Sequence, residues 1–400
     1  MPHQHKRSSL ISAISTLSAA VALTWAGLAH ADDPNPYYIG ASSSVGYDSN
    51  VLRLPKAQGD TTYSFGLLGG LDQTIGRQRL YASGTVQEAR FAKLKDLNYT
   101  SYNALAGIDW QTLYDLSGTL SYSTNQSLYS YGGTNTVQSN GKNVETRDEI
   151  IARGRWGGIS LLSLDTSFTH RKIAYSDPAY SFNALNQDGW SVGLTYKPRA
   201  LLTLGTAFRY TQGKYQLTRD FDRYDIDLTG TWTPTGQSSV SARLSYGDRK
   251  ARNGFSELDF KGTTGQLSWS YQPTGKLRFT TSFSHDSGAE SGFINLNGQQ
   301  LGGVGDNSRL TDTLTINSIY NLTAKIQINA GLLVSNRSLK TGPFNGNDTL
   351  RTASLGANYA VLRNASLGCS LRRETRSASG QGSYDFRASS VSCSAQISLQ

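Results

Sequence analysis

Side chains that could carry acid–base or metal chemistry are scarce in this 400-residue chain. His170 and His285 are the only histidines after residue 31, so the histidine pairs needed by metal sites and catalytic triads are largely missing. The HExxH, G-x-S-x-G and P-loop motifs are also absent from the sequence. We expect His170 to be a solvated histidine near the end of a strand. The sequence therefore predicts a protein that is not an enzyme and that holds no cofactor or metal ion.

The two cysteines, Cys369 and Cys393, could carry redox chemistry. Both occupy apolar positions of alternating segments near the end of the chain, and a turn near residues 376–382 would place them within two residues of direct opposition. An oxidising compartment permits disulfides. The spacing is compatible with a bridge that closes the last hairpin, and equally with two small, unbridged side chains that face lipid.

Arginine and aspartate recur at alternate positions between apolar residues. Asp225 and Asp227 alternate with Tyr224, Ile226 and Leu228. Successive side chains of a strand point to opposite faces, so these charges belong to the face opposite the apolar one. The residues expected on this polar face are Arg153, Arg155, Arg171, Arg209, Arg243, Arg278, Arg337, Asp72, Asp109, Asp165, Asp225 and Asp227. They could line a path for a polar or anionic solute, or they could pair with one another and brace the wall.

Strands must position these charges, because apolar and polar residues alternate along almost the whole chain after residue 31. Nine longer connections, rich in Gly, Asn and Asp, alternate with eight short ones and imply 18 strands. The longer connections include residues 48–61, 129–146, 174–186, 289–308 and 339–348. A sheet in hydrocarbon must close on itself, because lipid offers its backbone no hydrogen-bond partners. The predicted fold is an all-β, transmembrane, antiparallel up-and-down β-barrel of about 18 strands.

Aromatic residues precede the short turns once in each hairpin and are typical of a belt at the membrane boundary. They are Trp110, Trp156, Tyr196, Trp232, Tyr271, Tyr320 and Tyr359. A β-propeller could share this spacing, but its strands are shorter than the predicted ones. We therefore expect the bacterial cell outer membrane as the location, its lipids as partners, short turns on the periplasmic side and a water-filled pore inside.

The first 31 residues have the features of a secretory signal peptide. Lys6 and Arg7 precede a mostly apolar run over residues 10–28, and Ala29-His30-Ala31 fits the cleavage rule. We expect cleavage after Ala31, which leaves residues 32–400 as a single barrel domain. The net charge is +9, but Lys and Arg are spread along the chain, so we expect no nucleic-acid partner.

Three sequence segments near the start of the predicted barrel are distinctive. They are YDSNVLRLP at 47–55, RQRLY at 77–81, and LNY at 97–99 followed by AGIDWQ at 106–111. Over residues 37–112 the chain resembles the EpsL family of outer-membrane barrels encoded with exopolysaccharide biosynthesis machinery. The resemblance implies a role in export or assembly of an extracellular polysaccharide. It also implies this polysaccharide and its export machinery as partners. The outer-membrane assembly machinery is a further expected partner. We expect a pore for this export. The alternatives are a general diffusion porin and a plugged barrel that anchors the export machinery.

Overall fold

The computed structural model describes residues 35–129, 141–158, 161–216, 220–252, 259–287, 295–296, 299–300, 308–341, 344–380 and 383–399. The predicted signal peptide, its cleavage site after Ala31, and most of the predicted connection at 289–308 lie outside this part of the chain. The described residues contain no helix long and apolar enough to cross a membrane. Their helical structure consists of two short 3-10 segments, η1 (Lys95–Leu97) and η2 (Pro178–Asn183).

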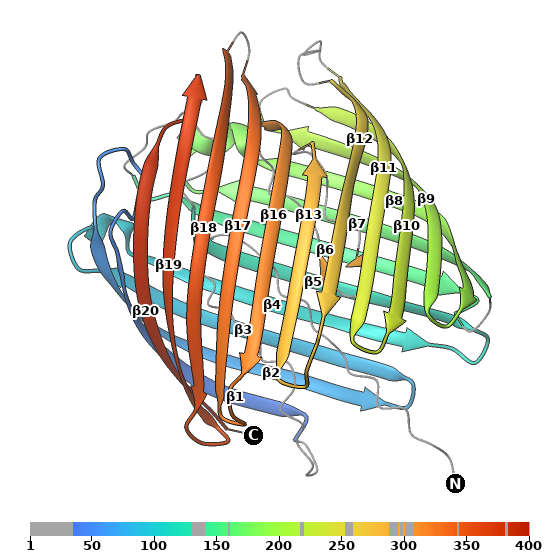
Figure 1. The fold of residues 1–400 in the computed structure, drawn as a ribbon, viewed down its shortest axis with the longest axis horizontal. Helices are drawn as coiled ribbons and strands as arrows, with labels where there is room; N and C mark the ends of the chain where they lie inside the picture. The colour runs from blue at the N-terminus through green and yellow to red at the C-terminus, as the bar shows by residue number, and fades with distance from the viewer. Residues whose placement is uncertain are drawn as a thin grey trace.

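Eighteen antiparallel strands form one sheet that closes into a barrel (Figure 1). Neighbours in sequence pair with each other, β13 pairs with β16, and β1 pairs with β20 to close the sheet. The barrel strands are β1 (Tyr37–Asp48), β2 (Asp60–Ile75), β3 (Gln78–Phe91), β4 (Tyr99–Gln111), β5 (Leu116–Leu128), β6 (Val144–Trp156), β7 (Leu162–Tyr175), β8 (Leu185–Arg199), β9 (Leu202–Tyr215), β10 (Phe221–Thr235), β11 (Ser238–Ala251), β12 (Phe260–Tyr271), β13 (Leu277–Asp286), β16 (Ser308–Asn321), β17 (Ile326–Thr341), β18 (Phe344–Ala360), β19 (Ala365–Gly380) and β20 (Phe386–Leu399). Two further short strands, β14 (Asn295–Leu296) and β15 (Gln299–Gln300), pair with each other. The prediction of an 18-stranded barrel is confirmed.

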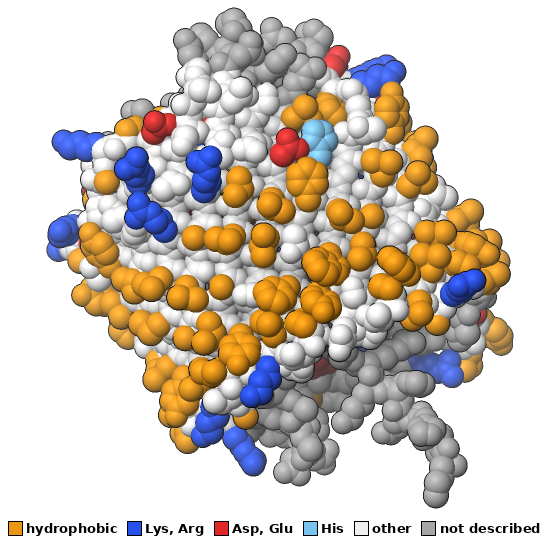
Figure 2. Space-filling model, viewed as in Figure 1, with side chains coloured by type: hydrophobic (Ala, Val, Ile, Leu, Met, Phe, Trp, Pro, Cys, Tyr) orange, Lys and Arg blue, Asp and Glu red, His pale blue; other side chains and the backbone are white. Residues whose placement is uncertain are grey.

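The alternation seen in the sequence separates the two faces of the sheet. On β9, Leu204 and Phe208 are exposed, whereas Arg209 and Thr211 are buried. Figure 2 shows hydrophobic side chains in a broad band across the outer surface, with more polar side chains above the band. A band of this kind is the lipid-facing surface of an outer-membrane barrel.

One predicted connection is absent from the structure. β17 continues to Thr341 and β18 begins at Phe344, and Lys340 pairs with Asn345. The prediction of a long connection at 339–348 is therefore wrong. Gly and Asn are poor strand formers alone, but ladder pairing with a neighbour outweighs their weak preference for strands. As a result Asp348 lies on the inner face of β18, where it is buried.

The β1–β2 connection braces the place where the barrel closes. Asn50 is fully buried, and its Nδ2 donates to the carbonyl oxygens of Leu54 (2.8 Å) and Arg387 (3.1 Å). Arg53, in a left-handed conformation with φ 52°, reaches Glu374 on β19 at 3.3 Å. The segment 47–55 that carries the EpsL resemblance thus ties the start of the barrel to its last two strands.

The orientation of the barrel in the membrane can be tested with epitope tags. In outer-membrane barrels the short turns face the periplasm. A tag inserted at the exposed residues 56–58 of the β1–β2 connection should therefore be labelled on intact cells, whereas a tag at 234–236 should be labelled only after the cells are broken. Labelling of the second tag on intact cells would reverse the orientation.

Candidate functional site

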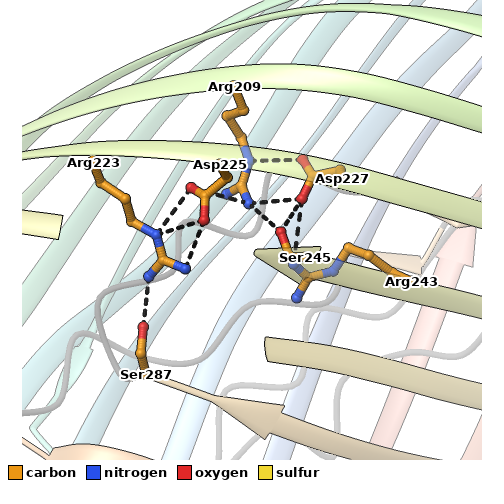
Figure 3. A network of polar contacts seen from close by, with 7 residues as sticks. All are labelled: Arg209, Arg223, Asp225, Asp227, Arg243, Ser245 and Ser287. Atoms are coloured by element: carbon orange, nitrogen blue, oxygen red, sulfur yellow. Dashed lines mark hydrogen bonds and ion pairs between the residues drawn. The ribbon is translucent and has the colours of Figure 1, made fainter. Parts of the chain in front are cut away.

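A network of buried charges lies on the inner wall of β9, β10 and β11 (Figure 3). We call it the wall network, and it consists of Arg209, Arg223, Asp225, Asp227, Arg243, Ser245 and Ser287. None of these residues is more than 8% exposed. The sequence placed Arg209, Arg243, Asp225 and Asp227 on the polar face, and the structure brings those four together.

Strand register positions the members of the wall network. Arg209 on β9 is opposite Asp225 on β10, and Asp227 is opposite Ser245 on β11. Because side chains on one face of a sheet recur every second residue, Arg223 lies beside Asp225 on the same face.

Two aspartates share three arginines in this network. Asp225 accepts from Arg223 Nε at 2.9 Å and lies 3.4 Å from Arg209 Nη2. Asp227 accepts from Arg209 Nε at 3.1 Å, lies 3.8 Å from Arg243 Nη1 and also accepts from the Ser245 hydroxyl. Buried charges need such partners, because leaving one unpaired costs several kcal/mol. The network therefore pairs these arginines on the inner wall and withdraws them from water.

The connection after β13 contributes the last member of the wall network. Arg223 Nη1 donates to Ser287 Oγ at 2.5 Å, although β13 is three strands away from β10 in the sheet. The chain that leaves β13 therefore turns toward the inner wall of β10.

A second set of inward charges remains in contact with water. This turn-side cluster lies next to the short turns, on β2, β3, β4, β6 and β7, and comprises Asp72, Arg79, Asp109, Arg155 and Asp165. The side chains of Asp72, Asp109 and Arg155 are 53%, 43% and 42% exposed. Arg79 pairs with Asp72 at 2.5 Å, and Arg155 pairs with Asp165 at 2.5 Å. These groups can meet a solute inside the barrel.

The remaining predicted lumen residues also lie on the inner face. Arg171 pairs with Glu149 at 2.6 Å, and Arg337 pairs with Asp348 at 2.7 Å. Arg278 donates to Gln272 at 3.1 Å. The Nη2 atom of Arg153 is buried without a hydrogen-bond partner. Whether any of them contacts a permeating solute stays a prediction.

Sequence analysis missed several inward charges. Arg223 has the parity of Asp225 and Asp227, so extending the alternation by one step would have found it. Glu149 has the parity of Arg153 and could have been found in the same way. Asp348 was missed because residues 339–348 were assigned to a loop.

The two cysteines lie on the outer face of the last hairpin. Cys369 and Cys393 are directly opposite each other in the β19–β20 ladder and form a disulfide, with a Cα–Cα distance of 4.1 Å. The sequence placed the two cysteines within two residues of direct opposition, and the structure has them directly opposite, because β19 runs to Gly380 and the turn lies slightly later than the assumed centre.

Oxidation of this pair in the native protein can be measured directly. Thiol titration of the unfolded, unreduced protein should find no free thiol, whereas the reduced protein should give two. The bridge closes a loop whose ends are 24 residues apart, which corresponds to about 3 kcal/mol in the chain-entropy model. Two free thiols in unreduced protein taken from an oxidising periplasm would exclude the bridge.

Comparison with known proteins places this fold among porins of the bacterial outer membrane. No protein-family model matches the chain, and no curated protein sequence matches it. Solved structures do match: OccK1 (OpdK) of Pseudomonas aeruginosa has a TM-score of 0.51 and 12% identity, over 91% of this chain and 99% of that chain. A BenF-like porin from Pseudomonas fluorescens Pf-5 has a TM-score of 0.50 and 13% identity, over 91% and 99% of the two chains. Similarity at this level of identity shows the fold alone.

The protein is thus a porin-like outer-membrane β-barrel. OpdK has also been solved with vanillate, and that structure matches with a TM-score of 0.51 and 13% identity, over 91% of this chain and 99% of that chain. These neighbours are porin-like barrels, and they lend no support to the EpsL resemblance.

Proposed function

We propose that this protein is an outer-membrane channel through which small hydrophilic solutes diffuse. The observation that carries the proposal is the turn-side cluster, whose charged side chains remain exposed to water inside a closed barrel of 18 strands. Barrels of 16 to 18 strands enclose an aqueous channel rather than a packed core. The similarity to porin structures supports the same class of function.

The wall network and the turn-side cluster have different roles in such a channel. The wall network pairs its charges away from water and holds the shape of β9–β11. The turn-side cluster presents both signs of charge to the lumen, so solutes of either charge can approach it. No catalytic chemistry is proposed, because the function needs only a water-filled path.

Conductance across planar bilayers tests the proposal. The purified protein should form ion-conducting pores, and Arg155→Ser should shift the selectivity toward cations, because it removes an exposed inward positive charge. Lys214→Ser removes a positive charge from the outer face of β9 and is the control, with no shift expected. A barrel that inserts but does not conduct would exclude an open channel.

Export of an extracellular polysaccharide is the second candidate function, and the sequence segments within residues 37–112 are what favour it. The structure gives one of them, residues 47–55, a bracing role at the closure of the barrel. Deletion of the gene distinguishes the two functions. Normal polysaccharide with slower uptake of small solutes supports diffusion. Loss of polysaccharide with normal uptake supports export, and the same loss from a non-conducting barrel supports a scaffold for the export machinery.

A further inference from the structure

Three arginines form a group on the outer face of the last three strands. Arg351 on β18, Arg373 on β19 and Arg387 on β20 are all exposed. We call this group the arginine triad. In Figure 2 positively charged side chains gather over the upper part of β18–β20, above the hydrophobic band.

Strand register fixes the spacing of the arginine triad. Arg351 is opposite Thr375 on β19, and Thr375 is in turn opposite Arg387. Two such steps across a ladder place the Cα atoms of Arg351 and Arg387 about 10 Å apart. Arg373 lies between them, two residues closer to the short turns. Long arginine side chains can bring three guanidinium groups from these positions to one anion.

Several other outward-facing charges near the same end of the barrel have partners. Arg252 pairs with Asp222 at 2.5 Å, His170 with Asp188 at 2.7 Å, and His285 with Asp312 at 2.6 Å. In contrast, the described strand residues of β17–β20 place no Asp or Glu on their outer face. For the triad, the structure gives a single side-chain contact, from Arg373 Nη1 to Ser389 Oγ at 3.4 Å. Asp385, an exposed residue directly before β20, accepts from the Ala378 backbone N–H at 2.6 Å and forms no ion pair with the triad in the described structure. The triad therefore keeps its positive charge available to a ligand.

The height of the triad matches the boundary between lipid chains and headgroups. On β18, the outward residues between Tyr359 and Arg351 are Ala357, Leu355 and Ala353. Eight residues along a tilted strand rise about 20 Å, close to the thickness of the apolar band of outer-membrane barrels. With the short turns in the periplasm, the arginines lie at the level of the headgroups of the outer leaflet.

The disulfide lies directly below this surface. Going from Cys369–Cys393 toward the long connections, the next outward-facing pairs are Leu371–Val391 and Arg373–Ser389. The covalent link thus holds β19 and β20 in register two residue pairs from Arg373. Two of the three arginines are fixed relative to each other by this hairpin.

We propose that the arginine triad binds the phosphate group of a phosphorylated glycolipid in the outer leaflet. Guanidinium groups form paired, charge-assisted hydrogen bonds with phosphate, and basic clusters at a membrane surface recognise anionic lipid headgroups. The apolar residues below the triad, including Leu355 and Leu371, lie where the acyl chains of the same lipid would run. This proposal is independent of what passes through the lumen.

Binding of lipid A to the purified, folded protein tests the proposal, with native mass spectrometry as the measurement. The protein should bind bis-phosphorylated lipid A about tenfold or more tightly than dephosphorylated lipid A with the same acyl chains, because each charge-assisted hydrogen bond is worth roughly that factor. The combined variant Arg351→Ser, Arg373→Ser, Arg387→Ser should lose this preference. Heat-modifiable gel mobility verifies that the variant is folded.

The matched control removes three other exposed, outward-facing positive charges near the same end of the barrel. Lys172→Ser, Lys214→Ser and Lys250→Ser together should leave the preference for phosphorylated lipid unchanged. Equal binding of the two lipids by the unmodified protein would overturn the proposal without reference to any variant. An equal loss of the preference for phosphorylated lipid in both triple variants would also overturn the proposal. So would binding of inorganic phosphate alone that is as tight as binding of bis-phosphorylated lipid A.

Discussion

Asp225→Asn is expected to destabilise the barrel by about 3–5 kcal/mol, the range observed when one partner of a buried ion pair is removed. The substitution keeps the shape of the side chain but removes the negative charge that faces Arg209 and Arg223. Both arginines are then left with excess positive charge at sites that are 2% and 0% exposed. Equilibrium unfolding from lipid vesicles in urea, followed by tryptophan fluorescence, measures the loss.

Asp72→Asn is the matched control for that experiment. Asp72 also faces inward and pairs with an arginine, but its side chain is 53% exposed and remains hydrated. Exposed ion pairs contribute about 1 kcal/mol or less, so the control should unfold at a urea concentration close to that of the unmodified protein. Substituting Arg223 together with Asp225 should recover part of the stability lost in Asp225→Asn. Similar stability of the two single variants would show that the wall network is not a brace.

The second large effect is expected on the outer face. Leu228→Arg places a charge near the middle of the hydrophobic band, where an arginine costs about 2–4 kcal/mol. Leu204→Arg places a charge nearer the edge of the band, opposite Tyr196, where the cost is smaller. Both leucines are exposed on the outer face of neighbouring strands, β9 and β10. The fraction of protein with heat-modifiable gel mobility after refolding into vesicles should fall for both variants.

Thr203→Arg tests the same change on the opposite face. Thr203 is adjacent to Leu204 in sequence but points into the lumen, where water can solvate the new charge. Its refolded fraction should remain near that of the unmodified protein. If all three variants lost the same fraction, the assignment of inner and outer faces would be refuted.

Alternation and turn spacing were enough to predict the strand number, the closed barrel and the face on which the charges assigned to the lumen lie. The period of two determines these features locally, so no knowledge of distant contacts is needed. The same reasoning placed Arg209, Arg243, Asp225 and Asp227 on one face, which is where the structure has them.

Which charges touch each other could not be predicted, because contacts depend on register between strands. A bulge between Trp232 and Thr235 shifts the β10–β11 ladder by one residue, so extrapolation from the short turn at 234–236 alone would misplace Asp227 relative to Ser245. The register of β9 against β10 depends on a longer connection, whose geometry the sequence does not specify. The burial of the wall network and the exposure of the turn-side cluster follow from these contacts.

The seam between β1 and β20 has a consequence for assembly. Ser49 and Ser389, which exchange hydrogen bonds there, are 340 positions apart in the chain. Contacts between such distant residues form late, because a long loop must close first. Until β20 meets β1, both strands present a row of unpaired N–H and C=O groups, which hydrocarbon cannot satisfy. The nearly complete sheet therefore needs water or another protein along its open edges, and closing the seam is the step that makes the barrel compatible with a lipid environment.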